Sequence, residues 1–285
     1  MRIIQNVKEM QNYAESLRKQ GKRISFVPTM GYLHEGHVSL MKEAKRRGDQ
    51  LIVSIYVNPV QFIAGEDFEK YPRDMARDEK IADAAGVDVI FSPAHAKMYP
   101  EQYQTYVTVE GVTRNLCGVS RPGHFRGVTT VCAKLFHIVK PHVAVFGKKD
   151  FQQLVAIRRM VDDLNMDIEI IGMPTARETD GLAMSSRNVY LKDGERESAL
   201  SLSRSLVTAR ELYAQGERDA DKILSRIRAY IEGHPYTRID YAKICNTKTL
   251  EDVERLAGKE VLALAVMVGS TRLIDNYVFG EELTI

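Results

Sequence analysis

Short apolar runs alternate with amphipathic stretches along the first part of the chain. Apolar residues recur three and four positions apart where a helix buries one face. This spacing predicts helices at Val7–Gln20, Val38–Gly48, Pro72–Ala85 and Val128–Val139, and from Asp150 to Leu164. The apolar runs between them predict buried strands at Arg23–Val27, Leu51–Val57, Val87–Phe91, Val143–Phe146 and Ile168–Ile171. Such alternation predicts a doubly wound parallel sheet, which binds ligands at the carboxyl ends of its strands.

The pattern changes after Met173 and Pro174. The remaining elements are expected as two helices and three strands, at Gly194–Gln215, Ala220–Ile231, Ile239–Ile244, Val261–Val268 and Arg272–Val278. We therefore predict a Rossmann-like domain at residues 1–174 and a smaller α+β domain at residues 175–285. Two intervening stretches are less regular. Tyr106–Val109 alternates weakly and predicts a short strand, and Arg121–Gly127 is rich in turn formers and predicts a loop.

Composition narrows the class of protein. Hydrophobic residues make up 44% of the 285 positions and charged residues 27%, which is typical of a globular protein. The net charge of +2, without a long basic run, indicates neither a nucleic acid nor a membrane partner. Three widely spaced cysteines indicate neither a disulfide framework nor a zinc cluster. With no signal-peptide pattern and no apolar run long enough to span a bilayer, we expect a cytoplasmic protein.

The stretch Val27–His37 carries the clearest chemistry. A strand that feeds a helix through a glycine-containing turn directs free N–H groups and the positive helix end at that turn. Gly31 and Gly36 leave room for close approach of a phosphate. His34 and His37 lie three residues apart in the first helical turn, so both can face the same phosphate. The stretch therefore predicts a nucleotide triphosphate site.

Two further stretches support this interpretation. Gly147–Asp150 repeats the layout of strand, glycine turn and helix, and Met184–Arg187 is a polar segment with two serines and an arginine. Taken singly, a histidine pair, a lysine pair and a Ser-Ser-Arg turn are common surface features. Their joint occurrence, with two of them at strand-to-helix turns, favours a functional site.

Other phosphate and metal motifs are absent from the sequence. Gly118 and Gly123 have the spacing of a P-loop, but His124 stands where lysine is required. A Gly-x-Gly-x-x-Gly fingerprint is missing. The histidines of residues 34–37 are three apart, whereas the zinc-protease motif requires four.

His34–His37 and Met184–Arg187 resemble the two ATP motifs of the adenylate-forming nucleotidyltransferase superfamily, which includes class I aminoacyl-tRNA synthetases. More narrowly, the chain resembles the pantothenate synthetase (pantoate–β-alanine ligase) family. The passages that carry the resemblance are Pro28–His37, Tyr56–Phe62, Phe146–Gln153, Asp180–Asn188 and Arg121–His124. Lys148 stands where an acidic residue would also suit the pattern. The resemblance covers most of the first predicted domain and reaches into the second.

The resemblance implies an enzyme that forms a C–N bond, an AMP-forming acid–amino-acid ligase of pantothenate biosynthesis. Pantoate would attack the α-phosphorus of ATP, and β-alanine would then convert the pantoyl adenylate into pantothenate and AMP. Mg²⁺ would accompany ATP, and the resemblance assigns it no protein ligand. The family also favours a homodimer, and a second domain that closes as a lid to exclude water from the adenylate.

The resemblance also assigns residues. Catalytic roles fall on His34, His37, Lys149, Ser185, Ser186 and Arg187, with the histidines, the lysine and the arginine expected as cations. ATP contacts are expected from Met30, Gly31, Tyr32, Leu33, His34, Glu35, Gly36, His37, Gly147, Lys148, Lys149, Asp150, Ala176, Met184, Ser185, Ser186 and Arg187. Substrate contacts are expected from Met30, Asn58, Gln61, Arg121, His124 and Gln153. Gln61 and Gln153 would hydrogen-bond pantoate, Met30 would pack on its methyl groups, and Arg121 and His124 would serve the β-alanine carboxylate or pyrophosphate.

Three other functions use similar features. A plain adenylyltransferase would transfer AMP to a phosphate acceptor, without need of the paired glutamines. A tRNA-charging enzyme would require an RNA-binding domain and a basic face. A nucleotide sensor would bind ATP without turning it over.

Overall fold

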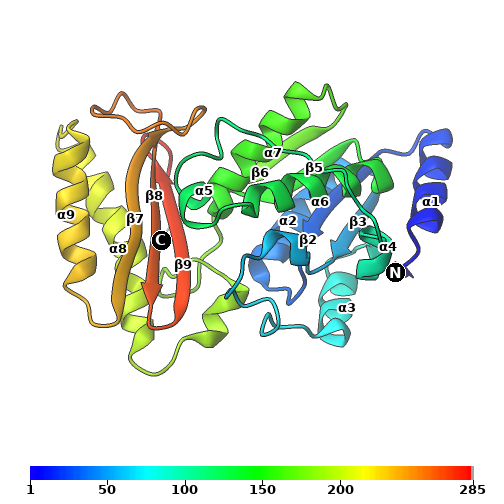
Figure 1. The fold of residues 1–285 in the computed structure, drawn as a ribbon, viewed down its shortest axis with the longest axis horizontal. Helices are drawn as coiled ribbons and strands as arrows, with labels where there is room; N and C mark the ends of the chain where they lie inside the picture. Colours follow the sequence, from blue (N-terminus) through cyan, green and yellow to red (C-terminus); the bar gives the residue numbers. More distant parts are fainter. Residues whose placement is uncertain (284–285) are drawn as a thin grey trace. The chain divides into compact units, whose positions relative to one another are not determined.

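The computed structural model describes residues 1–283, which form two compact units (Figure 1). Unit one consists of Met1–Val109, Arg121–Lys148 and Ala156–Pro174. Unit two consists of Glu110–Ser120, Lys149–Val155 and the described residues from Thr175 onward. The chain therefore passes between the units several times. The predicted domains, residues 1–174 and 175–285, stay a prediction.

Unit one is built on a six-stranded parallel sheet, which confirms the predicted fold class. The strand order is β1-β4-β3-β2-β5-β6. The strands are β1 (Arg2–Ile4), β2 (Ile24–Thr29), β3 (Gln50–Ile55), β4 (Val89–Phe91), β5 (Val143–Gly147) and β6 (Glu169–Met173). The order reverses between the neighbours β2 and β5, which is the switch point where such sheets bind ligands. The turns that follow these two strands are the predicted phosphate turns, and both leave the sheet at the same edge.

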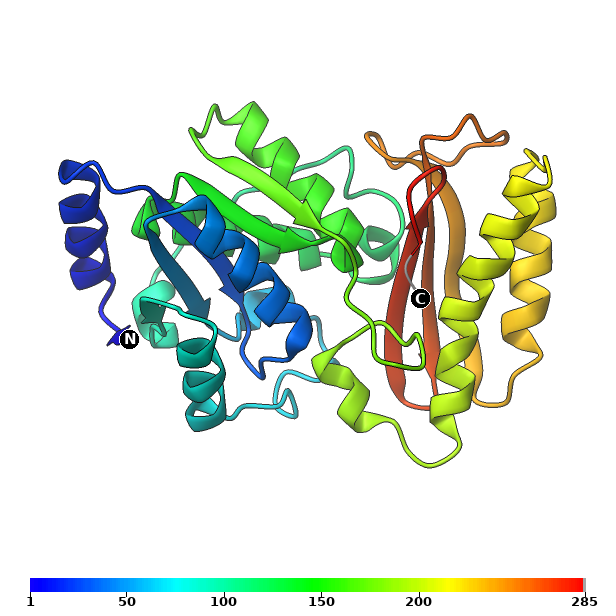
Figure 2. The same cartoon turned by 180° about the vertical axis from the view of Figure 1, so that it is seen from behind.

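Helices cover both faces of this sheet, as Figures 1 and 2 show. Their bounds are α1 (Val7–Lys19), α2 (Glu35–Arg47), α3 (Met75–Ala84), α4 (His95–Met98), α6 (His124–Val139) and α7 (Phe151–Asp163). Successive residues of β2 explain the two faces, because strand side chains alternate. Val27 is in the buried cluster of Met41 from α2, whereas the ring of Phe26 packs edge-on against Phe136 of α6.

Unit two contains the antiparallel sheet β7-β8-β9, formed by Thr237–Asn246, Glu260–Val268 and Thr271–Val278. The other helices of this unit are α5 (Cys117–Ser120), α8 (Glu195–Ala214) and α9 (Ala220–Glu232). Two short 3₁₀ turns, η2 (Lys148–Asp150) and η3 (Ser186–Tyr190), contain predicted site residues. Leucine, isoleucine and valine side chains of α8, α9 and the sheet share one buried core. The predicted α+β architecture is confirmed.

Some predicted elements were wrong. Tyr106–Val109 is not a strand, because two side chains of α6 replace a sheet partner. The Val107 N–H donates to the Thr130 hydroxyl (3.0 Å), and the Val107 carbonyl accepts from Thr129 (2.7 Å). The loop predicted at Arg121–Gly127 ends at Gly123. That glycine has a φ of 87°, which starts α6 at His124, four residues before Val128.

Other boundaries shift by a few residues. Strand β2 continues through Pro28 and Thr29, whose hydroxyl donates to the Ser54 carbonyl at 2.8 Å. Helix α3 begins at Met75 instead of Pro72, because the Asp74 side chain caps it by accepting the Arg77 N–H. Strand β1 was missed, since three residues at the start of a chain carry no readable period.

Gly127 of α6 lies against the 3₁₀ turn η1 (Pro59–Gln61). A Cβ atom at this position would overlap the Val60 carbonyl oxygen and come within 2.6 Å of the Gln61 Cα. We expect Gly127→Ala to lower the free energy of unfolding by about 1–3 kcal/mol, although alanine normally favours helices. Urea unfolding measures the change. Gly111→Ala is the control, because a Cβ there meets no atom within 4 Å. An unchanged Gly127→Ala variant would contradict this close approach.

Candidate active site

The turn between β2 and α2 has an unusual backbone. Gly31 and Tyr32 both have positive φ, at 83° and 50°. A Cβ on residue 31 would lie 2.9 Å from an Asp78 carboxylate oxygen and 3.0 Å from the Ile55 side chain. Only glycine therefore fits at position 31, and the turn carries Tyr32 in a conformation that a tyrosine rarely adopts.

A buried carboxylate holds this turn. Asp78 of α3 is 1% exposed, and its two oxygens accept the N–H groups of Tyr32 and Leu33, each at 2.7 Å. Burial raises the pKa of the Asp78 carboxyl, and the hydrogen bonds from these amides offset only part of the effect. The guanidinium of Arg77 lies 4.8 Å from the centroid of the Tyr32 ring. Asp78 thus fixes the loop through which the chain enters α2.

The sequence prediction missed Asp78. A signal existed: Asp78 follows Met75 by three residues and precedes Ala82 by four, so it lies on the apolar stripe of α3. An acidic residue on such a stripe requires buried hydrogen-bond donors.

His34 and His37 form a capping box at the start of α2. His34 is the N-cap, and its Nδ1 accepts the Gly36 N–H at 3.2 Å. The Nδ1 of His37 accepts the His34 N–H at 3.3 Å, and the two ring centroids lie 4.1 Å apart. Both Nδ1 atoms therefore serve the cap of α2, and each Nε2 is the ring nitrogen assigned to a ligand. The role of the pair as cations stays a prediction.

Three predicted substrate residues meet in unit one. The Gln61 side-chain amide donates to the Met30 sulfur (3.2 Å) and accepts from the Asn58 amide (3.2 Å). Asn58 is 1% exposed and also donates to the Gly127 carbonyl. Its Oδ1 is buried with no partner among the described residues. A buried acceptor of this kind suits a ligand hydroxyl or an ordered water.

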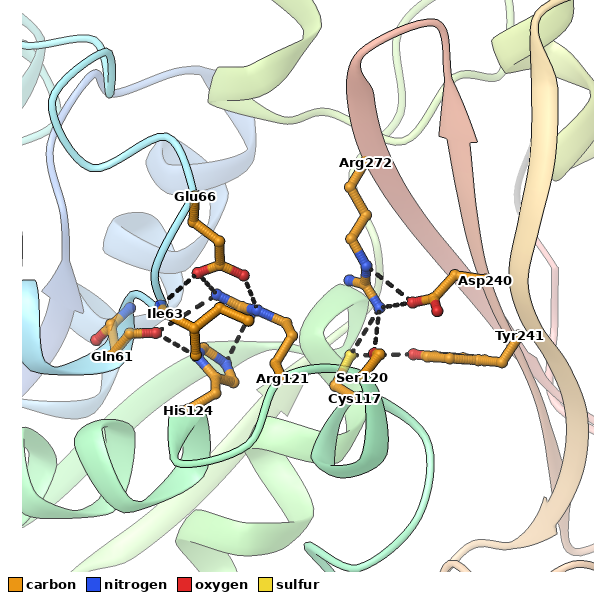
Figure 3. A network of polar contacts seen from close by, with 10 residues as sticks. All are labelled: Gln61, Ile63, Glu66, Cys117, Ser120, Arg121, His124, Asp240, Tyr241 and Arg272. Carbon is orange, nitrogen blue, oxygen red and sulfur yellow. Dashed lines mark hydrogen bonds and ion pairs between the residues drawn. The ribbon is translucent and has the colours of Figure 1, made fainter.

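Arg121 and His124 hold the main chain of Gln61, as Figure 3 shows. His124 Nδ1 lies 2.7 Å from the Gln61 carbonyl, and His124 Nε2 lies 2.9 Å from Arg121. Because Arg121 can only donate, Nε2 accepts and Nδ1 carries the proton. Arg121 also makes two hydrogen bonds to the Glu66 carboxylate, at 2.5 and 2.8 Å. Glu66, which the sequence analysis missed, thus neutralises Arg121 and fixes its direction.

Burial acts to raise the pKa of the Glu66 carboxyl. The hydrogen bonds from Arg121 and the Ile63 amide, with the charge of Arg121, outweigh burial and lower the pKa below its ordinary value of 4.5. The pKa of Glu66 is thus low enough for the carboxyl to stay ionised to a lower pH than an ordinary glutamate.

Of the other predicted site residues, Gly147 and Lys148 belong to unit one, whereas Lys149 and the residues after it belong to unit two. Lys149 lies in η2 at the start of α7, and the Asn276 side chain donates to its carbonyl at 2.8 Å. Ser185 caps η3 by accepting the Arg187 N–H at 3.2 Å, and Ser186 is 8% exposed. The Ala176 carbonyl accepts the Met184 N–H at 2.9 Å. Hydrogen bonds thus hold the segment Met184–Arg187 at both of its ends.

Gln152 and Gln153 differ in surroundings. The Gln152 side-chain amide is saturated by main-chain groups of Val112, Asn115 and Cys117. It holds the segment before α5 and is structural. Gln153, the predicted substrate residue, is half-buried.

Arg272 of β9 anchors α5 within unit two (Figure 3). It pairs with Asp240 at 2.6 Å and donates to the Ser120 hydroxyl at 3.3 Å and the Cys117 sulfur at 3.5 Å. Ser120 is therefore held by unit two, whereas the next residue, Arg121, is held by Glu66 of unit one.

Within residues 1–283, no three or more His, Cys, Asp or Glu side chains are grouped as metal ligands. No helix among the same residues is both long and apolar enough to cross a membrane.

The fold and its turns define an α/β protein in which the N-terminus of α2 lies at the switch point of a parallel sheet, a position that favours anions. Comparison with known proteins identifies the family. The pantoate-beta-alanine ligase family model matches residues 2–278, and the chain belongs to this family of ligases.

Individual relatives agree with this assignment. The pantothenate synthetase of Syntrophus aciditrophicus (strain SB) is 70% identical over 285 residues, which cover 100% of both chains. A crystal structure of pantothenate synthetase from Thermus thermophilus has a TM-score of 0.93 at 43% identity, covering 98% of this chain and 99% of that one. A Francisella tularensis pantoate-beta-alanine ligase, complexed with beta-gamma ATP and beta-alanine, has a TM-score of 0.80 at 34% identity, covering 98% and 97%.

The clamp on the β2–α2 turn predicts a specific loss of stability. Asp78→Asn keeps the size of the side chain but leaves one acceptor for two N–H groups. We expect the free energy of unfolding to fall by about 1–3 kcal/mol in urea titrations. Asp74→Asn on the same helix is the control, since asparagine caps as well as aspartate. Equal stability of the two variants would contradict the role of Asp78.

The lowered pKa of Glu66 predicts a pH dependence. At pH 7 we expect Glu66→Gln to lower the free energy of unfolding by about 1.5–3 kcal/mol. A lowered carboxyl pKa stabilises the fold above the ordinary value of 4.5, and the gain is lost as pH falls through the lowered pKa. The difference between variant and wild type should therefore shrink below pH 4.5.

Urea titrations from pH 7 to pH 3 test this dependence. Glu110→Gln is the control, because its pair with Arg114 is exposed, and we expect less than about 1 kcal/mol at every pH. A Glu66→Gln difference that stays constant over the range would refute the prediction.

Proposed function

We propose that this chain condenses pantoate with β-alanine at the expense of ATP and gives pantothenate, AMP and pyrophosphate. Membership of the pantoate-beta-alanine ligase family supports this function, as does the 70% identical pantothenate synthetase. The observation that carries the proposal is the cluster of half-buried Met30 with buried Asn58 and Gln61 beside the β2–α2 turn. It combines an apolar side chain with amides, which suits a branched hydroxy acid.

The reaction has two steps in this proposal. A pantoate carboxylate oxygen bonds to the α-phosphorus of ATP, and the bond to pyrophosphate breaks. The β-alanine nitrogen, as a neutral amine, then attacks the carbonyl carbon of pantoyl adenylate. The C–O bond to AMP breaks, and the nitrogen loses a proton. Such transfers need little covalent help from a protein, so placement of the reacting groups dominates.

The residues expected to bind ATP have two kinds of role in this proposal. The turn and first helical residues of unit one, Met30–His37, supply main-chain N–H groups and the Nε2 protons of His34 and His37. Lys149, Ser185, Ser186 and Arg187 supply charge and donors that strengthen as negative charge builds on phosphate. The other expected ATP contacts are Gly147, Lys148, Asp150, Ala176 and Met184.

Pantoate binds through Gln61, Gln153 and Asn58, with Met30 against its methyl groups. The Oδ1 of Asn58, which has no hydrogen-bond partner within residues 1–283, supports this placement because it would accept a pantoate hydroxyl. Analogues that lack the hydroxyl should be rejected strongly, since they leave buried polar groups unpaired. Arg121 and His124 contribute by holding the Gln61 main chain, beside the contacts expected with β-alanine or pyrophosphate.

Mg²⁺ enters with ATP in this proposal, and its charge would neutralise the phosphates. We assign it no protein ligand. We further propose a cytoplasmic homodimer without nucleic acid or membrane partners, and a second domain that closes on the adenylate.

The direct test measures AMP formed from ATP with pantoate, β-alanine, both or neither. We expect AMP only when both are present. AMP formed with either substrate missing would indicate that ATP is hydrolysed to AMP and pyrophosphate without condensation. Absence of turnover with both present would favour a nucleotide sensor.

His37 allows capping and chemistry to be separated. Glutamine at N3 also completes a capping box. His37→Gln should therefore retain stability, whereas His37→Ala should lose about 1 kcal/mol. We expect both variants to lose exchange of pyrophosphate into ATP, because both lack the imidazole Nε2. Full exchange activity in His37→Gln would show that His37 acts only as a cap. Lys149→Ala, which removes no capping side chain, should also lose exchange.

A further inference from the structure

Strand β9 carries two polar residues in succession, Asp275 and Asn276, both of which are buried. Successive strand side chains point to opposite faces of a sheet. Leu273 and Tyr277 lie on the same face as Asp275 and belong to the buried core of unit two. Two adjacent polar side chains therefore enter different environments, and the proposed reaction uses neither of them directly.

Asp275 holds the segment that leads into the serine loop. Its carboxylate pairs with both terminal nitrogens of Arg177, at 2.7 and 3.0 Å, and both side chains are almost fully buried. The Arg177 side chain also donates to the Gly181 carbonyl, and the Arg177 main chain forms an isolated antiparallel β-bridge with Ala183. Because Met184 follows directly, the start of the serine loop (Met184–Arg187) is fixed through Arg177 to β9.

Asn276 holds the lysine segment. Its side-chain amide donates to the Lys149 carbonyl at 2.8 Å, and its own N–H donates to Asp275. Lys149 lies two positions before Phe151, the first residue of α7. The contact with Asn276 therefore fixes the main chain from which the lysine side chain extends.

We propose that Asp275 and Asn276 form a positioning pair, which sets Lys149 and the serine loop at a fixed spacing within unit two. This inference rests on the proposed function, since it concerns groups assigned to ATP. One short stretch of backbone connects both anchors, so neither group shifts without the other. The spacing matters because displacement of a catalytic group by 1 Å can reduce a rate about 100-fold.

Asn276→Leu is the principal test, because leucine has a similar size and lacks the donor. In the full-length enzyme we expect kcat for exchange of pyrophosphate into ATP to fall about tenfold or more. The KM for ATP should change less than about threefold, since most contacts with ATP persist. The thermal midpoint should stay within about 4 °C of the wild type.

Asn246→Leu provides a matched control for loss of stability. Asn246 ends β7, and its side chain accepts the N–H groups of Lys248 and Thr249. The same substitution there removes hydrogen bonds from the same sheet without touching Lys149. We expect Asn246→Leu to keep wild-type exchange. An Asn276→Leu variant as active as Asn246→Leu would overturn the positioning pair.

Asp275→Asn tests the other anchor. We expect lower exchange and faster tryptic cleavage after Arg187, because the serine loop is held less firmly. Since loss of one partner from a buried ion pair is severe, the Asn276→Leu result decides the proposal if this variant does not fold. Lys149→Ala distinguishes failure of the proposed function from failure of the positioning pair. Normal exchange in Lys149→Ala would refute the role of Lys149 in the proposed function. An inactive Lys149→Ala beside a fully active Asn276→Leu would overturn the positioning pair alone.

Discussion

The hydrogen bonds that the Asp78 carboxylate accepts from the amides of Tyr32 and Leu33 are the constraint on which the rest of unit one depends. They hold a turn with two successive positive φ angles, and that turn aims the N-terminus of α2. The arrangement requires glycine at position 31, because the carboxylate occupies the space of a Cβ. A buried carboxylate thus determines how the chain enters α2.

The same principle recurs at the other predicted site residues. Residues that are expected to contact ATP or substrate are held by buried polar side chains, and these supporting side chains are not themselves expected to contact a ligand. Glu66 directs Arg121, which fixes the Gln61 main chain through His124, and Asn276 fixes the Lys149 main chain. Such support reduces the conformational freedom that each group must lose during the reaction. It also applies to His34 and His37, since their Nδ1 atoms accept main-chain N–H groups in the cap of α2.

Periodicity predicted the parallel sheet, the three strands of the second sheet and nearly all long helices, because each buries an apolar stripe readable in the sequence. Local exceptions escaped it. Val107 looked like part of a strand but bonds to two threonine side chains, and Gly123 starts a helix four residues early. The motif residues were recognisable by resemblance, whereas Asp78, Glu66 and Asn276 were not. Their roles depend on partners 45, 55 and 127 positions away in the sequence, which no local pattern reveals.

The central claim is that the chain activates a carboxylic acid with ATP before any amine is bound. A rapid-quench experiment with excess ATP, Mg²⁺ and pantoate, but without β-alanine, tests this most directly. The account predicts a burst of about one pyrophosphate per active chain, with AMP released only when β-alanine is added. Pyrophosphate release that needs no pantoate, or no burst before β-alanine arrives, would contradict it.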